Sequence, residues 1–373
     1  MSAATPTTPG TAPTPGTARA GGTGPSSQDE PPAPDAAAAV GARARLAALA
    51  TPPGALGRLG ETAVWWAGVR GTALPPPPQH VHLHLVAGDH GVVARGVSAF
   101  PASVTPLMVA AFLDGGAAAT VLARHLGVHV RTHDLAVDVD WPPGTDPALT
   151  AHKVRRGSGS IDTEDALSPA ETDAALAAGA AIAGSSVDAG ADLLIVADMG
   201  IGNTTPAAAL VAAVLGLDPR AATGRGTGVD DEGLARKGSV VAAAVVRARE
   251  RHGLDPLRLL GALGGADLVA MTGICLQSAR RRTPVLLDGV VVTAAALLAE
   301  RIAPGTAAWF VAGHRSSEPA HAPALDALGL EPLVDLGMRL GEGSGALVAL
   351  PLLSAAAVLL AETALLADLL PPA

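Results

Sequence analysis

The chain has 373 residues, and its 25 Lys and Arg against 34 Asp and Glu give a formal net charge of −9 at pH 7. Nucleic-acid binding depends on Lys and Arg side chains that neutralise phosphates, so this charge disfavours a general nucleic-acid partner. The single cysteine, Cys275, excludes an intramolecular disulfide and an all-cysteine zinc site. The length predicts one large domain or two modest ones.

Residues 1–35 consist mainly of Ala, Thr, Pro, Gly and Ser. Such a composition buries too little apolar surface to offset the conformational entropy lost on ordering, so we expect a disordered extension. The start of the chain has neither the basic nor the apolar segment of a signal peptide, and we expect a cytoplasmic protein.

The later part of the chain alternates between apolar runs typical of strands and longer Ala- and Leu-rich stretches of helical period. Strands followed by Gly-bearing turns and helices are typical of a parallel sheet covered on both faces, so we expect an α/β fold. We expect the first and last helical stretches to pack together. In chain order, the expected elements are helical 36–68, strand 81–88, helical 106–126, helical 169–184, strand 191–200, helical 234–252, strand 307–313 and helical 350–370.

The uncharged run at 343–361 is the strongest candidate for a membrane span. Its length is at the lower edge of the roughly 17–25 residues that a spanning helix needs. Pro351 interrupts it, and Glu342 and Glu362 bound it. The pattern favours a buried core helix, and we expect no association with a membrane.

Three polar loops directly follow strand candidates, namely AGDHGV, DMGIGNTT and AGHRSSEPAH. Ligands of parallel α/β sheets bind beyond the carboxyl ends of the strands, so the three loops predict one composite site. The segment 198–210, DMGIGNTTPAAAL, has the glycines and helix-capping residues of a phosphate cradle. It also fits an ordinary strand–turn–helix junction, and the residues alone leave the two readings open.

Two charged residues in the second half are candidates for chemistry. Glu342 lies between glycines before a very apolar stretch, where desolvation would raise its pKa and suit a general base. It also fits a helix-start glutamate favoured by the helix dipole. Lys237, one of two lysines, is either an anion ligand or part of a solvated helix face. The polar turn 313–321 is either a substrate loop or a surface turn.

A metal site has little support. His82 and His84 lie on one face of a strand near His90, but no carboxylate or cysteine spacing accompanies them. The chain also lacks a Walker A sequence and a correctly placed G-x-G-x-x-G fingerprint. We expect neither ATP-driven nor nicotinamide redox chemistry.

Eight segments in order resemble the nicotinate-nucleotide–dimethylbenzimidazole phosphoribosyltransferase family, which makes the lower-ligand nucleotide of cobalamin. The resemblance runs from about residue 40 to the end. The segments are DHGVVARGVSAFPASVT (89–105), FLDGGAAATVLAR (112–124), MGIGNTTPAAAL (199–210), GRGTGVDDEGLARK (224–237), GGADLVAMTG (264–273), PVLLDGVVVTAAALLA (284–299), GHRSSEPAH (313–321) and LGEGSGA (340–346).

The resemblance implies transfer of a phosphoribosyl group from nicotinate mononucleotide to a benzimidazole, with inversion at the anomeric carbon. Glu342 matches the family's catalytic glutamate, which takes the N–H proton of the base, and Asp198 is the second carboxylate. The family needs no metal and no cofactor. By the same resemblance, the phosphate and nucleotide are held by Gly200, Ile201, Gly202, Asn203, Thr204, Lys237, Gly313, His314, Ser316 and Glu318, and the base by Ser98, Leu107 and Leu340.

The family fold implies a Rossmann-like α/β domain at 76–345, and a small helical domain from both chain ends, 36–75 and 346–373. It also implies a homodimer. Two departures stand out: Asp198 replaces the family's usual Glu, and Leu107 replaces a Gln near the base pocket, which predicts altered base choice. A non-catalytic nucleotide-binding paralogue and an enzyme for a different phosphorylated substrate are the alternative readings.

Overall fold

The computed structural model describes residues 1–2 and 30–370. Most of the predicted disordered extension, residues 3–29, lies outside the described residues. At its end, the Pro32 carbonyl accepts a hydrogen bond from Nε1 of Trp309 at 2.8 Å. The Asp35 side chain then caps the first helix by accepting a hydrogen bond from the Ala38 N–H at 2.9 Å.

A five-stranded, fully parallel sheet in the order β2-β1-β3-β4-β5 forms the centre of the molecule. β3 is buried along its whole length because helices cover both of its faces, which matches its continuous apolar sequence. The predicted α/β fold is therefore confirmed. The strands are β1 (Val81–Gly88), β2 (His129–Ala136), β3 (Leu193–Met199), β4 (Val285–Leu287) and β5 (Phe310–Ala312).

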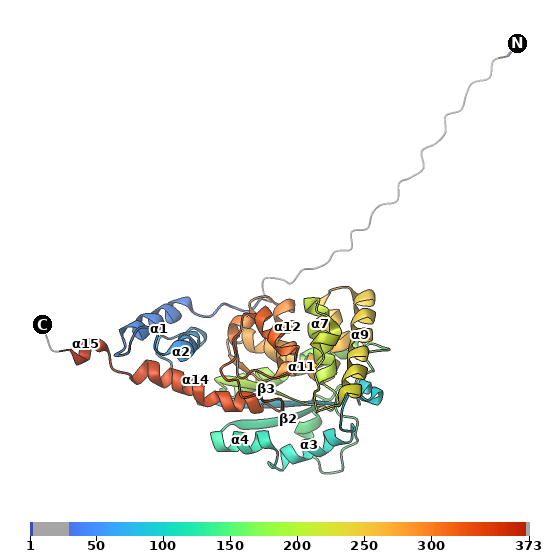
Figure 1. The fold of residues 1–373 in the computed structure, drawn as a ribbon, viewed down its shortest axis with the longest axis horizontal. Coiled ribbons are helices and arrows are strands. Elements are labelled where there is room, and N and C mark those ends of the chain that lie inside the picture. Colours follow the sequence, from blue (N-terminus) through green and yellow to red (C-terminus); the bar gives the residue numbers. More distant parts are fainter. Residues whose placement is uncertain (3–29, 371–373) are drawn as a thin grey trace.

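Helices cover the sheet on both sides (Figure 1). The helices α3 and α4 lie on one side, and α7, α9, α11 and α12 lie on the other. The helices are α1 (Ala36–Ala48), α2 (Gly57–Arg70), η1 (Gly91–Arg95), α3 (Val104–Leu113), α4 (Ala118–Leu126), α5 (Pro147–Thr150), α6 (Pro169–Asp188), α7 (Thr204–Leu215), α8 (Pro219–Ala222), α9 (Asp231–His252), α10 (Pro256–Leu263), α11 (Gly265–Arg280), α12 (Val290–Ile302), η2 (Thr306–Trp309), α13 (His321–Leu328), α14 (Ser344–Glu362) and α15 (Leu366–Leu369).

Four of the expected elements differ in the structure. The helical stretch 36–68 is α1 and α2, and 350–370 is the later part of α14 followed by α15. The helical stretch 106–126 is two helices, α3 and α4, because the chain turns at Asp114 and Gly115, the latter with φ 74°. The strand expected at 307–313 is a 3-10 turn followed by a strand of three residues. These differences shorten the elements but leave their order unchanged.

Helices from the two ends of the chain lie side by side at one end of the molecule (Figure 1). The helices α1, α2 and α14 share a small hydrophobic cluster that includes Ala42, Ala67 and Leu360. Arg45 of α1 donates hydrogen bonds to the carbonyls of Leu360, Ala361 and Thr363 at 2.9–3.1 Å. A cation at the carboxyl end of a helix satisfies carbonyls that have no partner within the helix, so Arg45 joins the first helix to the end of α14.

Two segments are long and apolar enough to cross a membrane, Val104–Leu126 and Ser344–Glu362. The first is interrupted between α3 and α4. The second is α14, whose buried residues pack against α2, α4 and β4. The apolar run at 343–361 is thus a helix that packs within the fold, as its sequence predicts.

Candidate active site

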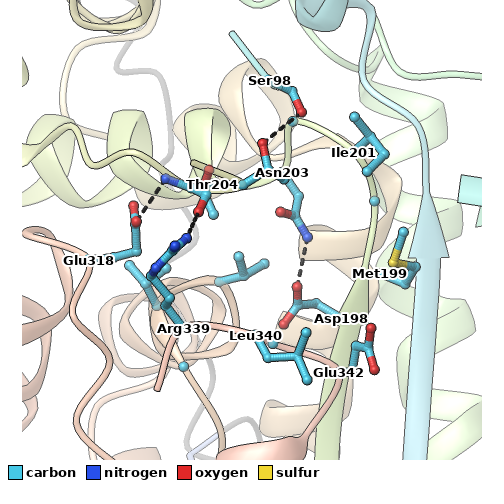
Figure 2. A pocket seen from close by; sticks show the side chains of 18 of the residues that line it. Ser98, Asp198, Met199, Ile201, Asn203, Thr204, Glu318, Arg339, Leu340 and Glu342 are labelled. Carbon is cyan, nitrogen blue, oxygen red and sulfur yellow. Dashed lines mark hydrogen bonds between the residues drawn. The ribbon is translucent and has the colours of Figure 1, made fainter. Parts of the chain in front are cut away.

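A cavity of about 300 Å³ opens at the carboxyl end of β3 (Figure 2). This is the edge of a parallel sheet at which ligands bind, and the volume is in the range of small-molecule sites. The cavity is lined by residues of β3, the turn 200–204 and the loops 97–104, 226–227, 289–291, 314–318 and 339–342. Two of the three predicted strand-end loops therefore contribute to it. In the third, His90 lies behind Gly200 and pairs with Asp267 at 3.0 Å.

Glu342 enters the cavity from an unusual backbone conformation. Its φ is 62°, and Gly341 and Gly343 on either side both have φ 80°. A side chain in the left-handed region costs about 1–2 kcal/mol, and such strain is concentrated at functional sites. The residue is only 6% exposed, and its Oε2 has no hydrogen-bond partner among the described residues. The glycines on both sides of Glu342 thus permit a backbone conformation that points its carboxyl group toward the cavity and away from α14.

The pKa of Glu342 is raised from its ordinary value, mainly because burial disfavours the charged form. The backbone N–H of Ala119, in the first turn of α4, lowers the pKa, and the carboxylate of Asp288 raises it. A carboxylate with a raised pKa and a free oxygen is suited to accept a proton near neutral pH.

Asp198, at the end of β3, is the second acidic group of the cavity. Its Oδ2 accepts a hydrogen bond from Nδ2 of Asn203 at 2.7 Å (Figure 2). The pKa of Asp198 is raised to about 7, mainly by burial and also by the nearby Asp288 carboxylate, while the Asn203 amide opposes the shift. Asp198 and Glu342 are therefore two buried carboxyl groups of the cavity whose pKa values are both raised by burial and by Asp288.

The turn 200–204 has the form of an anion cradle. Gly200 passes so close to the carbonyl of Gly88 that a Cβ at this position would clash with it. The helix α7 begins at Thr204, and the Asn203 side chain does not cap it, because that side chain binds Asp198. The expected side-chain cap is thus absent from this helix start, which leaves the positive end of α7 at the cavity wall.

Lys237 lies behind the cradle and does not line the cavity. It is fully buried in α9, so a solvated helix face is the wrong reading of this residue. Its Nζ donates a hydrogen bond to Oγ1 of Thr204 at 2.7 Å. Burial lowers the pKa of Lys237 to about 8, and the Glu318 carboxylate opposes this shift.

The turn after β5 is buried, so the surface-turn reading of this segment is also wrong. His314, Ser316 and Glu318 all line the cavity, and their exposed fractions are 1%, 7% and 8%. Glu318 accepts a hydrogen bond from the Gly226 N–H at 2.8 Å and so joins this turn to the loop before α9. Gly313 is not among the lining residues; it packs against the backbone of Ala346.

The three residues expected at the base pocket differ in position. Ser98 lines the cavity, and its Oγ lies 3.0 Å from Oγ1 of Thr227. Leu340 also lines the cavity. Leu107 does not: its side chain is 67% exposed on the outside of α3, whereas the next residue, Met108, faces the cavity. Successive helix positions point in directions about 100° apart, so within this chain Met108 takes the place expected for Leu107.

Arg339, three residues before Glu342, also lines the cavity and was not expected from the sequence. Its Nη1 donates a hydrogen bond to the Gly226 carbonyl at 2.8 Å (Figure 2). The signal for it lies in the segment MRLGEGSGA, where the arginine precedes the glycines. Other lining residues not expected from the sequence are Val97, Phe100, Val104, Met108, Met199, Gly226, Thr227, Gly289, Val290, Val291 and Gly341.

His82 and His84, the histidines considered as metal ligands, instead contact a serine hydroxyl. The Oγ of Ser186 lies 2.8 Å from Nε2 of His84 and 3.1 Å from Nδ1 of His82. Over residues 1–2 and 30–370, no group of three or more His, Cys, Asp or Glu side chains is arranged to hold a metal ion.

A family of proteins described as phosphoribosyltransferases matches residues 31–368 of the chain. The nicotinate-nucleotide–dimethylbenzimidazole phosphoribosyltransferase of Mycolicibacterium paratuberculosis is 56% identical over 326 residues, which cover 87% of this chain and 92% of that protein. The enzyme of the same name from Mycobacterium tuberculosis is 55% identical over 322 residues, 86% of this chain and 88% of that protein.

Solved structures agree with these relatives. The crystal structure of CobT from Thermus thermophilus superposes with a TM-score of 0.85 at 45% identity and covers 89% of this chain and 98% of that one. A nicotinate-nucleotide–dimethylbenzimidazole phosphoribosyltransferase structure from the same organism gives 0.84 at 43% identity, with 91% of this chain and all of that chain covered. The chain belongs to this phosphoribosyltransferase family.

Proposed function

We propose that the chain transfers the 5-phosphoribosyl group of nicotinate mononucleotide to 5,6-dimethylbenzimidazole or a related base, as the names of its relatives describe for those proteins. The products are α-ribazole 5′-phosphate and nicotinate, and the reaction contributes to the assembly of cobalamin. The single observation that carries this proposal is Glu342: a buried carboxyl group with a raised pKa and a free oxygen, in a cavity beside a phosphate cradle.

In the proposed step, one ring nitrogen of the benzimidazole attacks the anomeric carbon while Glu342 removes the proton from the other ring nitrogen. The bond between the anomeric carbon and the pyridine nitrogen breaks, and its electron pair stays on that nitrogen. Nicotinate therefore leaves with a neutral ring, and no general acid is needed. Because one displacement inverts the centre, the β-nucleotide gives the α-product. The remaining task of the cavity is to hold base and ribose in line.

The electrostatics of the cavity decide which groups hold the substrate anions. Asp198, Glu318 and Glu342 all line the cavity, and Arg339 is the only Lys or Arg among the lining residues that the structure describes. A phosphate entering beside three acidic groups needs positive charge and N–H donors. We assign the phosphate to the start of α7 and to Arg339, with Lys237 acting from behind through Thr204.

The test is a product assay with purified protein, nicotinate mononucleotide and 5,6-dimethylbenzimidazole, run beside Glu342→Gln. Wild type should yield α-ribazole 5′-phosphate identified by mass. Loss of the general base should lower kcat by about a hundredfold or more while nucleotide binding is kept. Calorimetric binding of the nucleotide by wild type without product, across a set of benzimidazole, purine and phenol acceptors, would contradict the proposal and indicate a non-catalytic paralogue.

We also propose a cytoplasmic homodimer, with the α/β domain at 76–345 and the helical domain formed by 36–75 and 346–373. Leu107, Leu113 and Val121 on α3 and α4 are 67%, 50% and 43% exposed. Apolar side chains gathered on consecutive helices are typical of an interaction surface. Sedimentation should give twice the chain mass, and Leu107→Asp should shift it toward the monomer; a monomeric wild type would contradict this.

A further inference from the structure

Asp288 is a fully buried acidic residue between β4 and α12 whose carboxylate binds a distant part of the chain. Its Oδ2 accepts a hydrogen bond from the Gly343 N–H at 3.2 Å, and its Oδ1 accepts one from the Ala346 N–H at 3.0 Å. Gly343 is the N-cap residue of α14 and has no side chain to serve as a cap. Asp288 therefore supplies, from the loop after β4, the capping carboxylate that this helix lacks.

The cap acts on the peptide group next to Glu342. The Gly343 N–H belongs to the peptide unit that joins Glu342 to Gly343, so its hydrogen bond fixes the orientation of that unit. Glu342 is in the left-handed region with φ 62°, a conformation that the surrounding structure has to hold. The direction of the Glu342 side chain therefore depends on the contact between Asp288 and the start of α14.

Asp288 also shapes the charge at the site. The acidic groups around it are Asp198 and Glu342, and its carboxylate raises the pKa of both. Nε2 of His314 lies 3.7 Å from its Oδ1. Asp267, from α11, acts on Asp198 in the same direction. Asp288 is not among the residues that line the cavity, so it acts on the reaction through lining residues that it contacts or influences, namely Glu342, Asp198 and His314.

We propose that Asp288 is the positioning residue of the site: by binding the Gly343 and Ala346 N–H groups it holds the left-handed backbone that aims the Glu342 carboxylate at the substrate. This inference rests on the proposed role of Glu342 as the base. In this proposal, a single buried side chain that does not touch the substrate couples the start of α14 to the orientation of the catalytic base.

The experiment measures kcat and kcat/KM against pH, and nucleotide affinity by calorimetry, for the full-length Asp288→Asn variant. Asn keeps the volume but offers one oxygen for two N–H groups. We expect kcat to fall about tenfold or more, since small displacements of a reacting group are costly, with nucleotide affinity within about twofold. The acidic limb of kcat/KM should also move to lower pH, because the charge that raises the pKa of Glu342 is removed.

Asp288→Glu separates geometry from charge, and it carries the test if the Asn variant does not fold. It keeps the negative charge but lengthens the side chain, so kcat should fall while the acidic limb stays in place. Asp134→Asn is the matched control: Asp134 is also fully buried and accepts the Val137 N–H, but it does not line the cavity. It should lower Tm without moving the limb.

The inference would be overturned if Asp288→Asn had wild-type kcat and an unchanged acidic limb of the kcat/KM pH profile. It would also be overturned if Asp134→Asn shifted that acidic limb to the same extent. If Asp288→Asn does not fold, wild-type kcat in Asp288→Glu overturns it. The Glu342→Gln assay distinguishes this failure from that of the proposed function. An active Glu342→Gln means that the base is misassigned, whereas an inactive one beside a wild-type-like Asp288→Asn means that only the positioning role is wrong.

Discussion

The carboxylate of Asp198 accepts a hydrogen bond from the side-chain amide of Asn203, five residues further along the chain, at 2.7 Å. This one neutral donor does not offset burial, because the pKa of Asp198 is raised to about 7. The group therefore stabilises the fold at low pH, and that contribution is lost as the pH rises from the value of an exposed Asp through about 7.

Asp198→Asn should consequently be more stable than wild type. The expected Tm difference is small at pH 5 and grows toward pH 8, where the buried carboxylate of wild type is ionised. Calorimetric Tm values of both proteins at several pH values check this. A Tm difference that is the same at pH 5 and pH 8 would contradict the raised pKa. Because Asp198 lines the cavity, the variant should lose activity as it gains stability.

Nucleotide binding should weaken in alkaline solution. The pKa of Lys237 is lowered to about 8, so its amine loses its charge above that pH and the cradle loses positive potential behind Thr204. KM for nicotinate mononucleotide should rise between pH 7 and pH 9, with kcat less affected. Lys237→Met should show a high KM that does not vary over this range. The same pH dependence in Lys237→Met would exclude the lysine as its source.

Arg339 should recognise the phosphate rather than the carboxylate of the nucleotide, because it binds the Gly226 carbonyl close to the cradle. Arg339→Gln should raise KM for nicotinate mononucleotide about tenfold. This corresponds to a loss of roughly 1.4 kcal/mol, the scale of one hydrogen bond to a charged group. Nicotinate riboside, which lacks the phosphate, should bind wild type and variant alike. If instead the variant ceases to discriminate the nicotinate from the nicotinamide nucleotide, the arginine binds the carboxylate.

Base preference should depend on Met108 and not on Leu107. Met108 lines the cavity beside Ser98 and Leu340, while Leu107 is exposed. Met108→Ala should change the ratio of kcat/KM values for benzimidazoles of different size about tenfold or more, since one methylene in an apolar pocket is worth about 1–3 kcal/mol. Leu107→Gln serves as the neighbouring control, with the same ratio as wild type. A change confined to Leu107→Gln would mean that Leu107 reaches the base in the assembled protein.

The hydrogen bonds between Arg45 and the end of α14 should contribute measurably to the free energy of unfolding. Arg45→Met removes three hydrogen bonds to the carbonyls at the end of α14 and should lower the free energy of unfolding by about 1–2 kcal/mol. Arg43, on the same helix, forms an exposed ion pair with Glu61. Arg43→Met should have an effect of at most about 0.5 kcal/mol. Urea denaturation compares the two, and equal effects would show that the carbonyl contacts add nothing.

The sheet was predictable where its strands are continuously apolar; β2, HVRTHDLA, is as long as β1 but half polar, and it was not expected. The run 81–88 coincides with β1, and 191–200 contains β3, because a strand buried on both faces needs a continuous apolar sequence. The three-residue strand β4 has no such signal of its own. In 106–126, the apolar residues continue through the turn at Asp114, so hydropathy alone indicates one long helix where the backbone forms two.

The site was predictable where an unusual backbone conformation requires glycines that can be recognised in the sequence. Glycines on both sides of Glu342 indicate a special conformation, and the structure gives that residue φ 62°. Arg339 has no comparable sequence signal, because a single arginine in a loop is common. Leu107 and Met108 lie in a helix, VTPLMVAAFL, whose residues are apolar on nearly every side. Without a polar face, the sequence gives no phase for the helix, and tertiary packing decides which of the two reaches the cavity.

The position of α14 has a consequence for the order in which the protein becomes active. The helix begins beside Glu342 and ends at the carbonyls that Arg45 binds, so it connects the site to the first helix of the fold. All five strands precede it in the chain. During synthesis, which proceeds from the N-terminus, the sheet can therefore assemble on the ribosome before the segment that carries the base has been made. A chain that stops before Gly341 would keep the phosphate cradle without the base: it could bind nucleotide but not turn it over.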